Sequence, residues 1–174
     1  MAALSNSRRG AAGIALIVSG ALFVLALVIQ LAGQSLPLVI VLAEVALVIA
    51  LVILALGAVN NRLVQVALFA AAVGWAIIAI AGLGVIAIPA TVVTIAAVVA
   101  AVGGVVGAIV LYTGKEISNR PAIVFIVAMI LGALFLLGLG IVSLGSLATI
   151  VLLLFGLALI VAGVLFRRTQ GGRR

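Results

Sequence analysis

The chain alternates between long apolar runs and short polar segments. Six of the runs are long enough to cross a bilayer, because a spanning helix needs roughly 20 apolar residues for a hydrocarbon core about 30 Å thick. We expect these helices at about residues 11–31, 36–56, 63–86, 90–112, 121–142 and 147–166. Pro37 and Pro89 lie where the second and fourth helices begin, a position that tolerates the missing N–H of proline. The pattern predicts an all-α, polytopic integral membrane protein with one transmembrane domain over residues 1–174.

The polar segments repeat along the chain. Arg9, Arg62 and Arg120 each come shortly before an apolar run, at intervals of 53 and 58 residues, which is the range in which internal repeats are sought. Each repeat contains two helices joined by an uncharged turn, the last of them at Ser143–Ser146. The chain therefore divides into three tandem helical hairpins, at about residues 8–58, 60–112 and 118–168. Either a pseudo-three-fold arrangement about the membrane normal or a simple up-and-down bundle would accommodate them.

The basic residues all fall on one side of this six-helix arrangement. They precede the first helix, lie between the second and third or the fourth and fifth, or follow the sixth: Arg8, Arg9, Arg62, Lys115, Arg120, Arg167, Arg168, Arg173 and Arg174. Cytoplasmic loops carry an excess of Lys and Arg, so both termini, including the tail 167–174, are expected in the cytoplasm. The preference for Arg over Lys and for Ala, Val, Leu and Gly favours a bacterial source.

Composition narrows the class of protein further. Hydrophobic residues make up 69% of the chain and charged residues 6%, whereas a soluble domain is about 45–50% apolar with about a quarter charged. The net charge is +7, but the basic residues occur singly or in pairs with no basic face, so we expect no nucleic-acid partner. Cys and His are absent, which excludes thiolate nucleophiles, imidazole bases and the usual zinc sites. With no catalytic constellation in view, we expect a non-enzyme without metal or cofactor.

One ionisable residue lies deep in an apolar run. Glu44 is about midway along the second helix, among apolar helical neighbours, and no Lys or Arg lies at that depth to pair with it. A carboxyl group in such surroundings favours its neutral, protonated form. An ionisable residue inside a membrane is a functional hypothesis by default, so Glu44 is the candidate functional residue. Three roles stay open for it: a structural hydrogen bond, a proton- or ion-linked function, and a contact between protomers.

Small residues indicate where helices pack, because they let backbones approach in a solvent as apolar as the side chains. The fourth helix is the richest in them, with rows at four-residue spacing: Ala96, Ala100, Gly103, Gly104, Gly107 and Ala108. We therefore expect this helix to occupy a central place in the bundle. Ser19, Thr91 and Thr94 are expected to bond back to carbonyl groups of their own helices.

Parts of the first and last hairpins resemble the HdeD family of small bacterial membrane proteins. The segments that carry the resemblance are Gly13–Leu22, Leu131–Leu137 and Leu154–Gly163, followed by Arg167 and Arg168. Six helices, three hairpins and this length fit the family, although the third turn has Ser143–Ser146 where the family usually carries a proline. The resemblance implies an inner-membrane protein linked to acid or stress resistance, and it supplies no site residues.

Two functions are compatible with these observations. The first is a structural or accessory membrane protein that acts by helix packing, with itself as a homo-oligomer or with a membrane-protein partner in the lipid bilayer. The second is a small channel or transporter with Glu44 on a proton or ion pathway. Transporters normally show broken helices or several polar groups converging at mid-membrane, and this chain shows neither, which favours the first function.

Overall fold

The computed structural model describes residues 6–34, 36–58, 61–115, 117–140 and 146–168. In these residues the chain forms six α-helices: α1 Asn6–Leu31, α2 Pro37–Gly57, α3 Arg62–Leu83, α4 Ala90–Thr113, α5 Asn119–Gly140 and α6 Ser146–Arg168. Each contains a segment long and apolar enough to cross a membrane, which confirms the predicted all-α fold of six candidate spans. Residues 143–145 of the third predicted turn and the tail 169–174, with Arg173 and Arg174, lie outside the described residues.

Two helix boundaries differ from the sequence prediction for identifiable reasons. Helix α1 begins at Asn6 and so includes the first two arginines, and Arg8 Nη1 donates to the Leu56 carbonyl oxygen in the last turn of α2 at 2.6 Å. The last carbonyls of a helix lack partners within it, so this bond joins the start of α1 to the end of α2. Helix α3 ends at Leu83 because Gly84 adopts a left-handed conformation, with φ of 66°.

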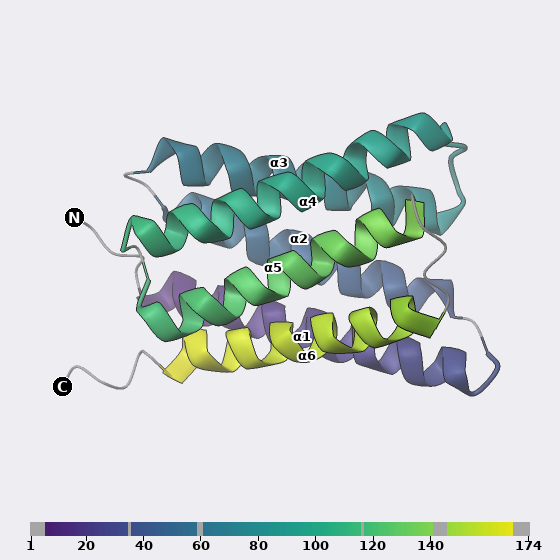
Figure 1. Ribbon diagram of the computed structural model, residues 1–174, viewed down its shortest axis with the longest axis horizontal. Coiled ribbons are helices and arrows are strands. Elements are labelled where there is room, and N and C mark those ends of the chain that lie inside the picture. The colour runs from purple at the N-terminus through teal and green to yellow at the C-terminus, as the bar shows by residue number, and fades with distance from the viewer. Residues whose placement is uncertain (1–5, 35, 59–60, 116, 141–145, 169–174) are drawn as a thin grey trace.

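The helices form a closed, flattened ring (Figure 1). Each helix contacts the one before and the one after it, and α1 contacts α6, so that every described helix has two neighbours. One layer contains α1, α2 and α3, and the other contains α4, α5 and α6. The start of α1 and the end of α6 lie at the same end of the bundle, together with the end of α2, the start of α3, the end of α4 and the start of α5. The described basic residues therefore gather at that end, which we call the basic end.

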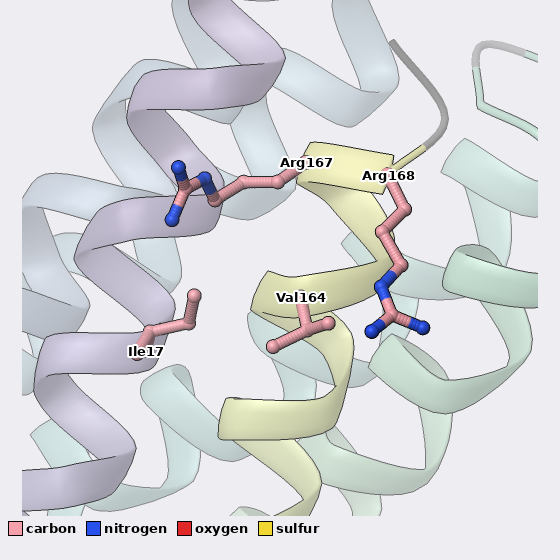
Figure 2. A pocket seen from close by; sticks show the side chains of 4 residues that line it. All are labelled: Ile17, Val164, Arg167 and Arg168. Carbon is pink, nitrogen blue, oxygen red and sulfur yellow. The ribbon is translucent and has the colours of Figure 1, made fainter. Parts of the chain in front are cut away.

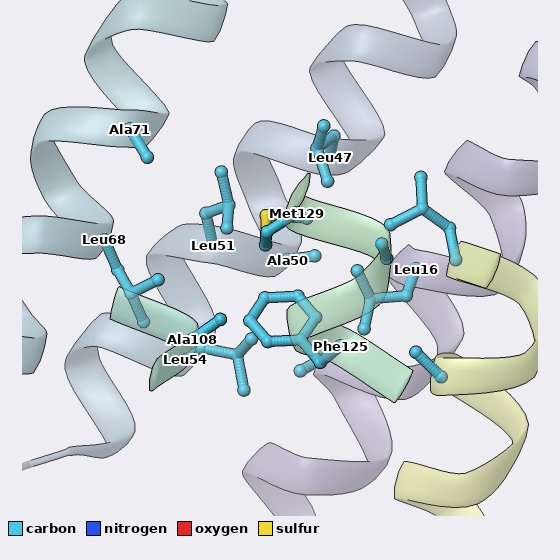
Figure 3. Close-up of a cluster of buried hydrophobic side chains, with 14 of the residues drawn as sticks. Leu16, Leu47, Ala50, Leu51, Leu54, Leu68, Ala71, Ala108, Phe125 and Met129 are labelled. Atoms are coloured by element: carbon cyan, nitrogen blue, oxygen red, sulfur yellow. The ribbon is translucent and has the colours of Figure 1, made fainter. Parts of the chain in front are cut away.

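Side-chain size explains why the ring is flat. At its two edges glycines bring backbones together: a Cβ added to Gly13 of α1 would lie 2.7 Å from the Gly163 carbonyl oxygen of α6. Between α3 and α4, a Cβ on Gly103 would lie 2.6 Å from the Ala67 carbonyl oxygen. In the middle, α2 and α5 face each other across large buried side chains, among them Leu51, Phe125 and Met129 (Figure 3). Large side chains thus separate the two layers of helices in the middle of the bundle, and small residues let them approach at its edges.

This packing selects the simple up-and-down bundle over the pseudo-three-fold arrangement. One close seam, α3·α4, lies within a hairpin, whereas the other, α1·α6, joins the first hairpin to the last. A three-fold repeat of the hairpins would place equivalent seams at equivalent positions. The expectation that the fourth helix is central is wrong, because α4 contacts α3 and α5 only and is a member of the ring like the other described helices.

Candidate functional site

Glu44 lies on the inner side of α2. Seven residues separate it from Pro37, so at 1.5 Å per residue it is roughly 10 Å from the start of the helix. Only 5% of its surface is exposed, whereas the next residue, Val45, is 42% exposed on the outer face. The carboxyl group therefore faces neither lipid nor a second protomer in this structure. Its Oε2 atom is buried and has no hydrogen-bond partner among the described residues.

A cross-helix hydrogen bond lies directly beside this carboxyl group. Ser19 Oγ of α1 donates to the carbonyl oxygen of Ala43, the residue before Glu44, at 2.8 Å, and Ser19 is fully buried. The expectation that Ser19 bonds back within its own helix is therefore wrong: the seryl hydroxyl joins α1 to α2 because Ala43 lies at the contact between them. Thr94 follows the expectation, with Oγ1 donating to the Ala90 carbonyl oxygen at 3.0 Å.

Three aromatic rings cross the interior of the bundle. Phe23 of α1 lies 5.3 Å from Phe155 of α6 and 6.3 Å from Trp75 of α3, measured between ring centroids, and Trp75 stacks on Phe155 at 6.1 Å. The backbone of α3 contacts neither α1 nor α6, so the Trp75 side chain reaches helices that are not its neighbours in the ring, whereas Phe23 and Phe155 lie on adjacent helices. Aromatic pairs at such distances are favourable beyond the area that they bury. The three aromatic side chains thus fill the space that the six helices enclose at this level.

Little room remains beside the aromatic rings. The gaps between Trp75, Phe155 and the facing residues of α4 and α5, including Ala100, Met129 and Gly132, total about 170 Å³. No part of this space is wide enough for a water molecule. The arrangement can therefore support packing, and this space admits no water unless side chains move.

The small residues of α4 are buried at its contacts with both neighbours. Ala96, Ala100, Gly103, Gly104, Gly107 and Ala108 all lie in the buried part of the helix. Ala96 and Ala100 pack on Gly74 of α3, while Gly104 faces the sulfur of Met129 on α5. Gly107 lies against the side chain of Leu68. These residues hold α4 in the ring and take no part in a site.

Sequence reasoning missed the close contact between the first and last helices. Gly13 and Gly20 of α1 lie against Gly163 and Gly156 of α6, each glycine facing a backbone carbonyl of its partner. The pairing is antiparallel, and both helices carry their glycines at a seven-residue spacing. Two matching spacings on distant helices were the available signal, but a search for four-residue spacing passes over it. We call this contact the α1·α6 seam.

No grouping in the described residues indicates a metal site, since three or more His, Cys, Asp or Glu side chains do not come together there. The remaining polar feature is the basic end, where Arg8 bonds to Leu56 as described above. Arg167 and Arg168 occupy the last turn of α6 at that end.

Comparisons with known proteins add no family to this description. The chain matches no protein-family model, no curated protein sequence and no solved structure. What is established is a polytopic, apolar membrane protein of six sequentially packed helices.

Proposed function

We propose that the protein is a non-catalytic accessory component of a membrane, acting by contact with a partner or with itself rather than by conducting a solute. The observation that carries this proposal is the filled interior, where the side chains of Phe23, Trp75 and Phe155 occupy the space between the helices at one level. The resemblance to the HdeD family adds a role in acid or stress resistance, in the cytoplasmic membrane of a bacterium and with both termini in the cytoplasm. No cofactor is part of the proposal.

The outer surface suggests where a partner would bind. The outward residues of α4 are bulky and branched, including Ile95, Val102 and Ile109, whereas its small residues are buried inside the bundle. Close, glycine-mediated packing is thus used within the chain, and the outer surface suits lipid. A partner, or a second copy in a homo-oligomer, is better accommodated at the basic end, where exposed polar and basic side chains gather.

Flux measurement tests the proposal. We expect liposomes that contain the purified protein to hold a pH gradient as long as protein-free liposomes do, because the aromatic rings block a continuous water path. Gramicidin-treated liposomes control for the response of the pH-sensitive dye. Proton flux above that of protein-free liposomes would contradict an accessory role.

A second candidate function is favoured by one observation. Glu44 is a buried carboxyl group whose Oε2 has no described partner, and burying such a group costs stability. An ionisable residue inside a membrane at this cost is a candidate for function. A proton- or ion-linked role would be such a function. Flux in liposomes that Glu44→Gln abolishes would establish this second function, since a neutral amide cannot carry a proton.

A further inference from the structure

A groove opens on the outer surface at the basic end of the α1·α6 seam (Figure 2). Ile17 of α1 and Val164, Arg167 and Arg168 of α6 line it, and its volume is about 340 Å³. Neighbouring Val18 and Val161 are 45% and 48% exposed, so the groove opens toward the surface that faces lipid. It thus combines two cations with an apolar wall at the level where a membrane passes from headgroups to acyl chains.

The positive charge in the groove is not balanced within the described chain. Arg167 and Arg168 are both exposed, and neither makes a hydrogen bond or ion pair with another described residue. The one described acidic residue, Glu44, is buried on α2, which does not contact α6. The C-terminus of α6 contributes about half a negative charge, which two guanidinium groups exceed. The groove therefore favours an anion that the described residues do not supply.

The shape of the groove indicates an amphipathic anion. Figure 2 shows the Arg167 side chain extending over α1 and the Arg168 side chain on the other side of Val164. A Cβ on Gly13 would lie 3.0 Å from Arg167 Cγ, so the aliphatic stem of this arginine rests on the backbone of α1. Val164 lies one helical turn, about 6 Å, below Arg168. A free phosphate would use the arginines alone, whereas a lipid could also place a hydrocarbon chain against the apolar wall.

We propose that this groove binds an anionic phospholipid, with the phosphate headgroup between Arg167 and Arg168 and an acyl chain against Ile17 and Val164. Planar guanidinium groups bind phosphate through paired hydrogen bonds. The lipid would touch the first and last helices of the chain at once, so its binding favours the closed ring. Anionic lipid should then stabilise the folded protein as any ligand of the native state does.

Native mass spectrometry of the full chain tests the proposal directly. The protein in neutral detergent is mixed with equal amounts of phosphatidylglycerol and phosphatidylcholine, and bound lipids are counted. We expect phosphatidylglycerol to be retained preferentially and to raise the melting temperature. The double variant Arg167→Gln/Arg168→Gln should lose affinity for phosphatidylglycerol about tenfold to thirtyfold, the attraction of two arginines near an anionic surface.

Two further variants separate the site from its charge. Lys115→Gln/Arg120→Gln removes one cation from the α4–α5 connection and one from the first turn of α5, at the same end of the bundle, and should keep the preference. Val164→Trp keeps both arginines but fills the apolar wall and should reduce retention. Equal retention of both lipids by the wild type, or an equal loss in the Lys115/Arg120 variant, would overturn the site. Competition by inorganic phosphate at equimolar concentration would overturn its assignment to a lipid.

Discussion

At position 44 the chain places a carboxyl group where few polar atoms are tolerated. Leu47 and Leu51, which follow on the same inner side of α2, are fully buried and apolar. The Ser19 hydroxyl next to Glu44 is already used, because it donates its hydrogen bond to the Ala43 carbonyl oxygen and not to the Glu44 carboxyl group. Burying a polar group without a hydrogen bond costs about 1–3 kcal/mol, more than one interhelical hydrogen bond in a membrane contributes. The buried carboxyl group of Glu44 therefore lowers the free energy of unfolding of the protein.

Replacing Glu44 by leucine should leave stability unchanged or raise it. The substitution removes a buried oxygen that lacks a partner and keeps a similar volume, so up to about 1–3 kcal/mol is regained. Glu44→Gln should be nearly silent, because the amide keeps the polar atoms in place. Thermal unfolding in detergent measures both, with Val45→Leu on the outer face as the control. A loss of stability in Glu44→Leu as large as that in Leu47→Ala would mean that the carboxyl group has a partner other than the described residues, such as a bound cation.

The burial of Glu44 could be anticipated only in part from the sequence. Its depth in the membrane follows from the hydropathy of the residues around it. The side of α2 that faces the interior could not be assigned, because all its other residues are apolar and lipid is as apolar as a protein core. The helix carries no amphipathic pattern that would distinguish the two environments.

At the scale of helices, spacing of small residues decides which backbones touch. Gly13 and Gly20 match Gly163 and Gly156 across the α1·α6 seam, and the same seven-residue spacing recurs between α3 and α4, where Gly103 lies against Ala67 and Gly74 against Ala96. Not every glycine is equally constrained. A Cβ on Gly104 would meet only the flexible side chain of Met129, at 3.1 Å, whereas one on Gly74 would meet the Ala96 carbonyl oxygen at 2.5 Å.

A bulky residue at Gly20 should separate α1 from α6. Its added side chain would collide with the Gly156 carbonyl oxygen and with the Ile160 backbone nitrogen, atoms that cannot move without shifting the helix. Gly20→Leu should therefore cost at least the 1–3 kcal/mol typical of overpacking, which lowers the melting temperature or broadens the size-exclusion peak. Ala21→Leu is the matched control, because Ala21 is exposed on the outer face of the same helix. Equal behaviour of the two variants would contradict the seam.

The helices themselves were largely predictable and their ring was not. Long apolar runs with prolines at two starts locate all six. The errors lie at helix ends, where Arg8 bonds to another helix and Gly84 adopts a left-handed conformation. Ring closure depends on Gly13 and Gly163, which are far apart in sequence and are linked only by the matching seven-residue spacings to Gly20 and Gly156. The abundance of small residues in α4 suggested a central helix, but a close seam with α3 and side-chain packing against α5 are enough to bury them.

For the whole molecule, the interior and the ends follow different physical rules. Aromatic residues from non-adjacent helices fill the interior. This packing therefore needs all three hairpins, because each hairpin supplies one of the three rings. The ends are distinguished by charge alone. Arg8, Arg62, Lys115, Arg120, Arg167 and Arg168 all belong to the basic end, and the α3–α4 connection at the opposite end has no charged residue. Because lipid surrounds the apolar faces, this charge difference is what would orient the protein in a membrane.

Single cysteines can report that orientation, because the chain has none of its own. Val85 is 80% exposed in the α3–α4 connection, and Ser118 is exposed in the α4–α5 connection at the basic end. An impermeant maleimide applied to intact bacterial cells should label Val85→Cys and spare Ser118→Cys, since cytoplasmic loops of membrane proteins carry an excess of Lys and Arg. Permeabilised cells should label at both positions, which controls for the reactivity of each thiol. The reverse pattern in intact cells would place the basic end outside, and it would put the groove of Arg167 and Arg168 in the outer leaflet.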